Sequence, residues 1–112
     1  MTASQMAALV ESELARVSSE SIVAKIRRLL VEPRCEDRPW DYGASGQTFP
    51  CWIVAEHLPS NTVFAYCEQG FGPRCPWGLL GRSGEYLNMG MDSGWFVSLE
   101  DAVKDSWAWE EK

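Results

Sequence analysis

The sequence predicts an α+β fold in which an antiparallel sheet of three to five short strands packs with a long N-terminal helix and a C-terminal helix. Apolar residues recur at helical spacing through residues 4–31. Two runs rich in β-branched and aromatic residues, 51–57 and 62–68, are separated by four turn-forming residues, which is typical of an antiparallel hairpin. A second stretch of helical spacing follows Ser98. At 112 residues, the chain is expected to form one domain, residues 1–112.

The N-terminal helix is expected to bend or to split into two near Ser18–Ser21. Apolar positions keep spacings of three and four up to Val17, but the next apolar residue of the pattern, Ile22, follows after five. The apolar stripe therefore slips at the serine-rich segment, where a serine is suited to cap a second helix. Pro33 is expected to end the helical segment.

Residues 32–49 are expected to form a long loop, because they combine prolines, glycines and alternating charges. Loops of this length are uncommon inside compact domains, and they tend to be functional or to cover a sheet edge. Trp40, Asp41 and Tyr42 lie in this segment and are predicted to bind a partner. The alternative is that both rings fold back onto the sheet.

Both strands of the predicted hairpin carry apolar residues on both faces, which favours a sheet that is covered on two sides. Helices and the long loop are the available covers. Two further strands are expected at about 76–81 and at 86–91. A turn at 92–94 then leads into the short apolar run 95–97.

The last helix is expected to begin after Ser98, which approximates a capping box with Asp101 three residues later. Trp107 and Trp109 are two residues apart near the end of this helix, so their side chains point about 200° apart. One of these rings is therefore expected to pack in the core while the other faces solvent.

The composition favours a protein partner over a nucleic acid. The chain has 10 basic and 16 acidic residues and a formal net charge of −6, whereas phosphate binding requires clustered lysines and arginines. A basic partner is expected instead. Acidic residues are most frequent within 100–112, so the negative charge is concentrated at the C-terminus. The six tryptophans exceed ordinary usage, and tryptophan is enriched where proteins bind one another.

The N-terminal residues lack the basic and apolar regions of a secretory signal, and no apolar run approaches the length of about 18 residues that a membrane span requires. We therefore expect a soluble, cytoplasmic protein that does not bind membranes. Its cysteines, Cys35, Cys51, Cys67 and Cys75, are then expected to be reduced, although the sequence leaves metal-bound or paired cysteines open. Their spacings contain no closely spaced pair of the kind that structural zinc uses, so we expect no metal and no cofactor.

Two patterns that suggest catalysis are not supported by their context. Asp92-Ser93-Gly94 resembles the catalytic loop of aspartic proteases, but the Gly-Arg segment that follows this loop in that family precedes it here. The tripeptide is better explained as a turn. His57, the only histidine, is expected at the opposite end of the hairpin from Cys67, which disfavours a Cys-His pair. We expect no enzymatic activity.

We therefore predict a soluble acidic protein-binding module, of the kind that serves as a bacterial inhibitor or immunity protein against a basic protein such as a nuclease toxin. The partner-binding residues are expected among aromatic and acidic side chains: Trp40, Asp41, Tyr42, Trp77, Asp105, Trp109, Glu110 and Glu111. Two alternatives are open. One is a small enzyme or ligand-binding protein with a pocket near Gly70–Trp77 that uses Cys75 or His57, and the other is a subunit that forms a homodimer.

Overall fold

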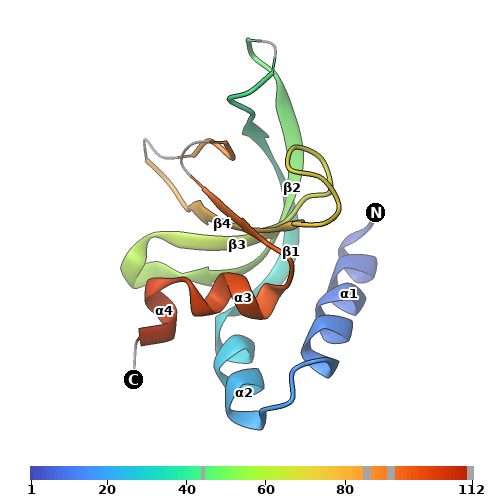
Figure 1. Ribbon diagram of the computed structural model, residues 1–112, viewed down its shortest axis with the longest axis vertical. Coiled ribbons are helices and arrows are strands. Elements are labelled where there is room, and N and C mark those ends of the chain that lie inside the picture. The colour runs from blue at the N-terminus through green and yellow to red at the C-terminus, as the bar shows by residue number, and fades with distance from the viewer. Residues whose placement is uncertain (44, 85–86, 91–92, 111–112) are drawn as a thin grey trace.

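The computed structural model has the predicted α+β architecture (Figure 1) and describes residues 1–43, 45–84, 87–90 and 93–110. In these ranges, five strands form one antiparallel sheet in the order β1-β2-β3-β4-β5. The strands are β1 (Leu30–Pro39), β2 (Thr48–His57), β3 (Thr62–Tyr66), β4 (Trp77–Gly81) and β5 (Gly94–Phe96). The helices are α1 (Ala3–Ala15), α2 (Glu20–Leu29), α3 (Leu99–Lys104) and α4 (Trp107–Glu110), with a short 3₁₀ turn at Leu58–Ser60.

The N-terminal helix is split, as the apolar spacing indicates. Residues 16–19 connect α1 to α2 and include part of the serine-rich segment. Ser19 occupies the N-cap position of α2, but its hydroxyl pairs with that of Ser21 at 2.9 Å rather than with the helix backbone. α1 begins with a capping box in which the Thr2 hydroxyl accepts a hydrogen bond from the Gln5 N–H at 3.1 Å.

The expectation of a loop throughout 32–49 is wrong for residues 32–39 and 48–49, which lie in strands, and a connection between strands is confined to 40–47. α2 leads directly into β1, which pairs with β2 from Leu30 opposite Ala55 to Pro39 opposite Thr48, with an irregularity between Leu30 and Arg34. Most side chains of β1 are half-buried or exposed, since this strand lies at the edge of the sheet. The edge position explains why a strand with alternating charges and prolines forms here, because the N–H group that proline lacks is not needed on the open side of an edge strand.

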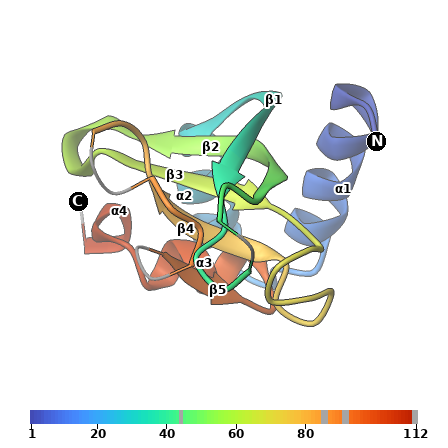
Figure 2. The ribbon, with the colours of Figure 1, turned by 90° about the horizontal axis from the view of Figure 1, so that it is seen from above.

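The sheet is covered on both faces, as predicted. The larger core lies between the sheet and α1, α2 and α3, and it contains Met6, Val10, Leu14, Ile26, Val54, Phe64, Trp77 and Leu99 among its buried residues. The smaller core lies on the opposite face and consists of Cys51, Ile53, Val63, Ala65, Cys67, Leu80 and Met89. In Figure 2, α1 lies beside the sheet and α3 runs along its lower side. The face with the smaller core is covered by loops and aromatic side chains instead of helices.

The strand expected at 86–91 lies partly outside the described residues, and its described part, 87–90, is not a strand. The Met89 N–H donates to the Pro39 carbonyl at 2.9 Å. This segment therefore lies against the end of β1 and helps to cover the smaller core.

The predicted C-terminal helix is broken into α3 and α4. Ser98 caps α3 as expected, because its hydroxyl accepts a hydrogen bond from the Asp101 N–H at 3.1 Å. At the break, the Ser106 hydroxyl donates to the Val103 carbonyl at 2.6 Å, a bond of the type that competes with helix continuation. No helix in the described ranges is both long enough and apolar enough to cross a membrane.

Candidate binding surface

Five aromatic side chains from different segments of the chain meet at the smaller core. Trp40 and Tyr42 lie at the tip of the β1–β2 hairpin, Phe49 in β2, Phe71 in the β3–β4 loop and Trp95 in β5. We call these residues the aromatic cluster. The Trp40 ring centroid lies 5.2 Å from that of Tyr42, 5.6 Å from that of Phe49 and 5.1 Å from that of Phe71. Tyr42 and Trp95 each lie 6.1 Å from Phe71.

The outer rings of the aromatic cluster are open to solvent, while the inner rings are packed. Tyr42 is 60% exposed and Phe71 is 45% exposed, whereas Trp40, Phe49 and Trp95 are half-buried against the smaller core. Three of the ring pairs are edge-to-face, and such pairs contribute about 0.5–1.5 kcal/mol each beyond the area that they bury. The exposed rings are therefore held in place without a partner, which lowers the entropic cost of binding one.

Backbone and side-chain hydrogen bonds fix the hairpin tip that carries Trp40. The Trp40 N–H donates to the Gln47 carbonyl at 2.9 Å, which closes the tip. The Asp41 carboxylate accepts a hydrogen bond from the Asn88 side-chain amide at 2.5 Å. Gly90 lies directly against Asp41, since a Cβ atom on this glycine would come within 2.5 Å of a carboxylate oxygen. The tip is thus attached to the segment 87–90.

The β3–β4 loop brings Phe71 to the aromatic cluster through a glycine. Gly70 has a φ of 76°, which is in the left-handed region. A Cβ atom added to Gly70 would lie 3.0 Å from the Trp40 ring and 2.9 Å from the Met89 methyl group. Both the backbone conformation and the close approach therefore favour glycine.

A buried arginine lies beneath the hairpin tip. Arg38 is 4% exposed, and one terminal nitrogen of its guanidinium donates to the carbonyls of Gly81 and Leu87 at 2.8 and 3.2 Å. Its other nitrogens donate to the Glu36 carboxylate at 2.9 and 3.2 Å. Burial raises the pKa of Glu36, but hydrogen bonds from Arg34 and Arg38 outweigh this effect, so the pKa of Glu36 is lowered. Arg38 thus joins β1 to β4 and to the segment before β5.

Among the residues predicted to bind a partner, Trp40, Asp41 and Tyr42 lie in or beside the aromatic cluster. Trp77 lies elsewhere: it is 2% exposed and packs against Tyr66 in the larger core, with ring centroids 4.9 Å apart. The expectation that Trp77 is a surface anchor is therefore wrong. The physical reason is that β4 lies between β3 and β5, so this strand has paired neighbours and covered faces.

At the C-terminus, the exposed tryptophan is not the one predicted. Trp107 is 72% exposed, whereas Trp109 packs at the margin of the larger core. The ammonium groups of Lys25 and Lys104 lie 4.9 and 5.7 Å from the Trp109 ring centroid. Trp109 is half-buried and is therefore less accessible than Trp107, and its role as a partner-binding residue stays a prediction. The spacing of the two tryptophans predicts that they point apart but does not indicate which one points inward.

The acidic part of the predicted site is separate from the aromatic cluster. Asp105 is exposed just after α3, while Glu111 and the side chain of Glu110 lie outside the described residues. In Figure 1, α4 lies near the C-terminus in the lower half of the molecule, and the hairpin tip lies at the upper end. The predicted residues therefore fall in separate regions instead of forming one site.

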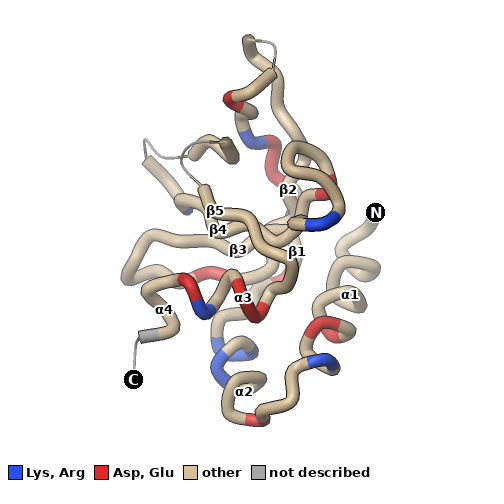
Figure 3. Tube along the Cα trace, viewed as in Figure 1, with Lys and Arg blue, Asp and Glu red and all other residues tan. Residues whose placement is uncertain are grey.

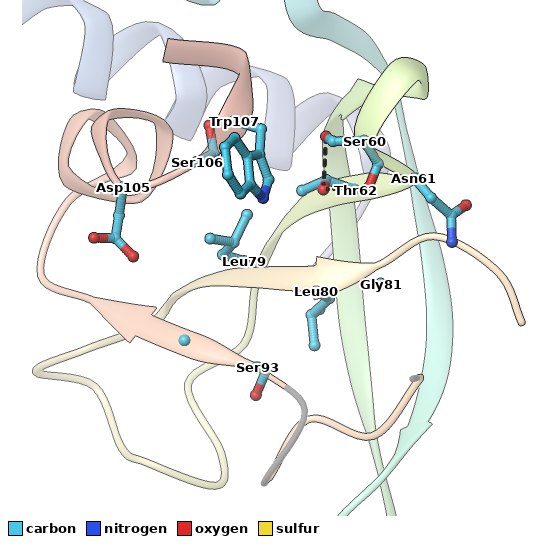
Figure 4. A pocket seen from close by; sticks show the side chains of 11 residues that line it. Ser60, Asn61, Thr62, Leu79, Leu80, Gly81, Ser93, Asp105, Ser106 and Trp107 are labelled. Carbon is cyan, nitrogen blue, oxygen red and sulfur yellow. Dashed lines mark hydrogen bonds between the residues drawn. The ribbon is translucent and has the colours of Figure 1, made fainter. Parts of the chain in front are cut away.

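An open groove of about 650 Å³ lies beside Trp107 (Figure 4). Its lining is mainly small and polar, with Ser60, Asn61, Thr62, Gly81, Ser93, Gly94, Asp105 and Ser106 next to Leu79 and Leu80. The Ser60 hydroxyl donates to the Thr62 hydroxyl at 2.9 Å and pairs with His57 Nδ1 at 2.6 Å. The Ser60 hydroxyl is thus used within the turn that follows β2. The groove also lies away from 70–77, the segment at which the sequence suggested an alternative pocket.

The register of the β2–β3 hairpin separates His57 from Cys67, as predicted. His57 is opposite Thr62, whereas Cys67 follows the other end of β3. The four cysteines all lie in the described part of the chain, where they are free thiols. Within that part, no group of three or more His, Cys, Asp or Glu side chains is placed to hold a metal ion. Asp92, from the tripeptide that resembles a protease loop, lies outside the described residues.

Comparisons of the chain with protein-family models, with curated proteins and with solved structures find no match. Function is therefore inferred from the surface of the molecule itself. Of the features described above, the aromatic cluster is the one that combines large exposed apolar side chains with a fixed geometry.

Proposed function

We propose that the protein is a binding module for another protein and that the aromatic cluster is the centre of its binding surface. The supporting observation is that Tyr42 and Phe71 are 60% and 45% exposed although Trp40 holds both rings in place. Contiguous exposed apolar side chains are characteristic of binding sites. Aromatic side chains are suited to this role because they bury a large area and lose little conformational freedom on binding.

The charges of the molecule favour a basic partner. The net charge is −6, and Asp41 is exposed next to the two open rings. Figure 3 shows acidic and basic residues along the β1–β2 hairpin and on α3, and the basic residues of α2 lie at the end of the molecule away from the hairpin tip. Complementary charges accelerate association and select against wrong partners. We therefore expect association to slow as the salt concentration rises.

Within this role, the specific function that we propose is an inhibitor or immunity-type protein of the bacterial kind, which blocks a basic protein such as a nuclease. Its support is the combination of small size, acidity and a rigid aromatic surface. Nucleases carry basic surfaces to hold nucleic-acid phosphates, and an acidic protein complements such a surface.

A capture experiment with matched variants tests the proposal. Tagged wild type, a Tyr42→Ser/Phe71→Ser variant and a Val97→Ser/Trp107→Ser control are incubated with extract of the source organism, and bound proteins are identified by mass spectrometry. The control removes apolar side chains that are 68% and 72% exposed but lie outside the aromatic cluster. We expect wild type and control to retain one basic protein in stoichiometric amount and the cluster variant to lose it. Equal retention by all three proteins contradicts the proposal, as does recovery of nothing above background under several growth conditions.

Two further measurements make the comparison decisive. Far-ultraviolet circular dichroism and urea unfolding show whether the variants are folded, which we expect because the replaced side chains are exposed. Light scattering at two protein concentrations shows whether a second copy of the chain occupies the aromatic cluster. A mass that doubles for the wild type but not for the cluster variant would favour a homodimer over a foreign partner.

A further inference from the structure

The two cysteines of the smaller core lie opposite each other, Cys51 on β2 and Cys67 directly after β3. In the antiparallel ladder of β2 and β3, Trp52 pairs with Tyr66. One step further along the same register places Cys51 opposite Cys67. Both cysteines are buried, at 0% and 2% exposure. Two thiols thus face each other in a part of the sheet that is closed to bulk solvent.

The backbone hydrogen bond of Cys67 determines how close the two residues are. The Cys67 N–H donates to the Pro76 carbonyl at 2.8 Å, on the side of β4, and therefore points away from β2. Opposite residues that do not exchange backbone hydrogen bonds have Cα atoms about 4.5 Å apart in antiparallel sheets. A disulfide requires Cα atoms about 4.4–6.8 Å apart. The ladder therefore brings Cys51 and Cys67 within bonding range without moving either strand.

The two thiols differ in their chemistry. The Cys51 thiol donates to the Phe49 carbonyl and the Cys67 thiol to the Gln69 carbonyl, each at 3.7 Å. The interaction with Cys67 together with burial raises the pKa of Cys51. The interaction with Cys51 lowers the pKa of Cys67 against the effect of its burial. The thiolate is the nucleophile in disulfide exchange, so Cys67 is the residue of the pair that attacks first. Because Cys67 is only 2% exposed, a reagent reaches its thiol when the chain opens locally, and Cys67 directly follows the end of β3, where the ladder with β2 ends.

We propose that Cys51 and Cys67 form a reversible intramolecular disulfide in the folded protein, by exchange with a low-molecular-weight disulfide such as oxidised glutathione. The Cys67 thiolate attacks one sulfur of the reagent, which forms a mixed disulfide and releases one glutathione thiolate. Cys51 then gives up its proton and attacks the Cys67 sulfur, which releases the second glutathione. Two electrons pass from the protein to the reagent, and the two thiol protons end on the two glutathione molecules.

The other two cysteines provide an internal comparison. Cys35 lies on β1 opposite Trp52 and is exposed, and Cys75 lies in the β3–β4 loop. If accessibility alone decided the outcome, Cys35 would react in preference to the buried pair. The ladder geometry predicts instead that the stable intramolecular cross-link joins Cys51 to Cys67.

Disulfide mapping of the native full chain tests the proposal. The protein is incubated with excess oxidised glutathione, quenched with acid, alkylated, digested and analysed by mass spectrometry. We expect a cross-link between the peptides that contain Cys51 and Cys67, with loss of two hydrogen atoms, unchanged circular dichroism and full reversal by dithiothreitol. The cross-link should also raise the thermal midpoint, because it restricts the unfolded chain. The same cross-link is expected in a Cys35→Ser/Cys75→Ser variant.

A trapping variant tests the order of attack. In Cys51→Ser the resolving thiol is absent, so we expect Cys67 to accumulate as a mixed disulfide with glutathione. Three results would overturn the proposal: Cys51 and Cys67 remain free thiols in the treated native protein, the cross-link involves Cys35 or Cys75, or it forms only in denaturant. The wild-type map decides between these outcomes even if a serine variant fails to fold.

Discussion

Replacing Arg38 with methionine is expected to destabilise the protein far more than the same replacement at Arg34. Both arginines lie on β1 and both bind Glu36, but the Arg38 side chain is 4% exposed and the Arg34 side chain is 42% exposed. Methionine supplies a long apolar chain without the charge or the donors. The two variants therefore compare an arginine that donates to buried carbonyls with a more exposed one that pairs with the carboxylates of Glu36 at 2.9 Å and Glu56 at 2.6 Å.

The expected cost follows from the groups that Arg38→Met leaves behind. The carbonyls of Gly81 and Leu87 lose donors at 2.8 and 3.2 Å, and a buried polar group without a partner costs about 1–3 kcal/mol. The Glu36 side chain is 35% exposed and can be hydrated instead. Removing the buried guanidinium also relieves its desolvation cost, which offsets part of the loss. We therefore expect a loss of about 2–4 kcal/mol for Arg38→Met and of less than about 1 kcal/mol for Arg34→Met.

Urea unfolding of the wild type and the two variants measures this difference. A shift of the midpoint at an unchanged m-value reports a change in the free energy of unfolding alone. A loss below about 1 kcal/mol for Arg38→Met would refute the reasoning, because that is the range of an exposed ion pair. Equal losses for the two variants would refute it as well.

Three further predictions concern other parts of the fold. Trp109→Ala should lose about 2–3 kcal/mol of unfolding free energy, since its ring packs against the larger core and two lysines, whereas Trp107→Ala, which removes a 72% exposed ring, should change it by less than about 0.5 kcal/mol in the same urea assay. Burial and the 2.7 Å hydrogen bond to the Glu68 carboxylate raise the pKa of Tyr66 to about 12. The unfolded chain therefore loses this proton first, so stability should fall as the pH rises from the ordinary tyrosine pKa of about 10 towards the folded value. Glu68→Gln should lower the pKa of Tyr66 in an ultraviolet titration, and an unchanged titration curve would contradict this account. Gly78→Ala should lower the thermal midpoint and the free energy of unfolding, because the added Cβ atom would lie 2.7 Å from the Trp95 ring. We expect the free energy of unfolding to fall by about 1–3 kcal/mol, and a change outside this range would contradict the described packing of Trp95 against Gly78.

The central strands and the split N-terminal helix are predictable from the sequence because their causes are local. The run 51–57 is rich in β-branched and aromatic residues, and the slip between Val17 and Ile22 lies within a few residues of the helix break. β1 is different, because its alternating charges and prolines disfavour a strand when considered alone. It forms because β2 offers an open edge, and that cause lies in another part of the chain.

The candidate site is predictable only in part for the same reason. Trp40 and Tyr42 are predicted because they are aromatic residues in a segment that lacks core periodicity. Phe71 is missed as a member of the same surface, since it reaches Trp40 only through the fold, and its flanking glycines are the only local signal. Trp77 is misassigned because composition shows a surplus of indole rings but does not indicate which of them the sheet buries.

The affinity of the captured partner for single variants of the aromatic cluster tests the central claim most directly. Isothermal titration calorimetry would compare wild type with Tyr42→Ala, Phe71→Ala and the exposed control Trp107→Ala. Each cluster variant should weaken binding by about tenfold or more, because loss of a central aromatic anchor costs about 1.4–2 kcal/mol or more. The control should bind within about twofold of the wild type. Equal affinities for all four proteins would contradict the claim that the aromatic cluster is the binding surface.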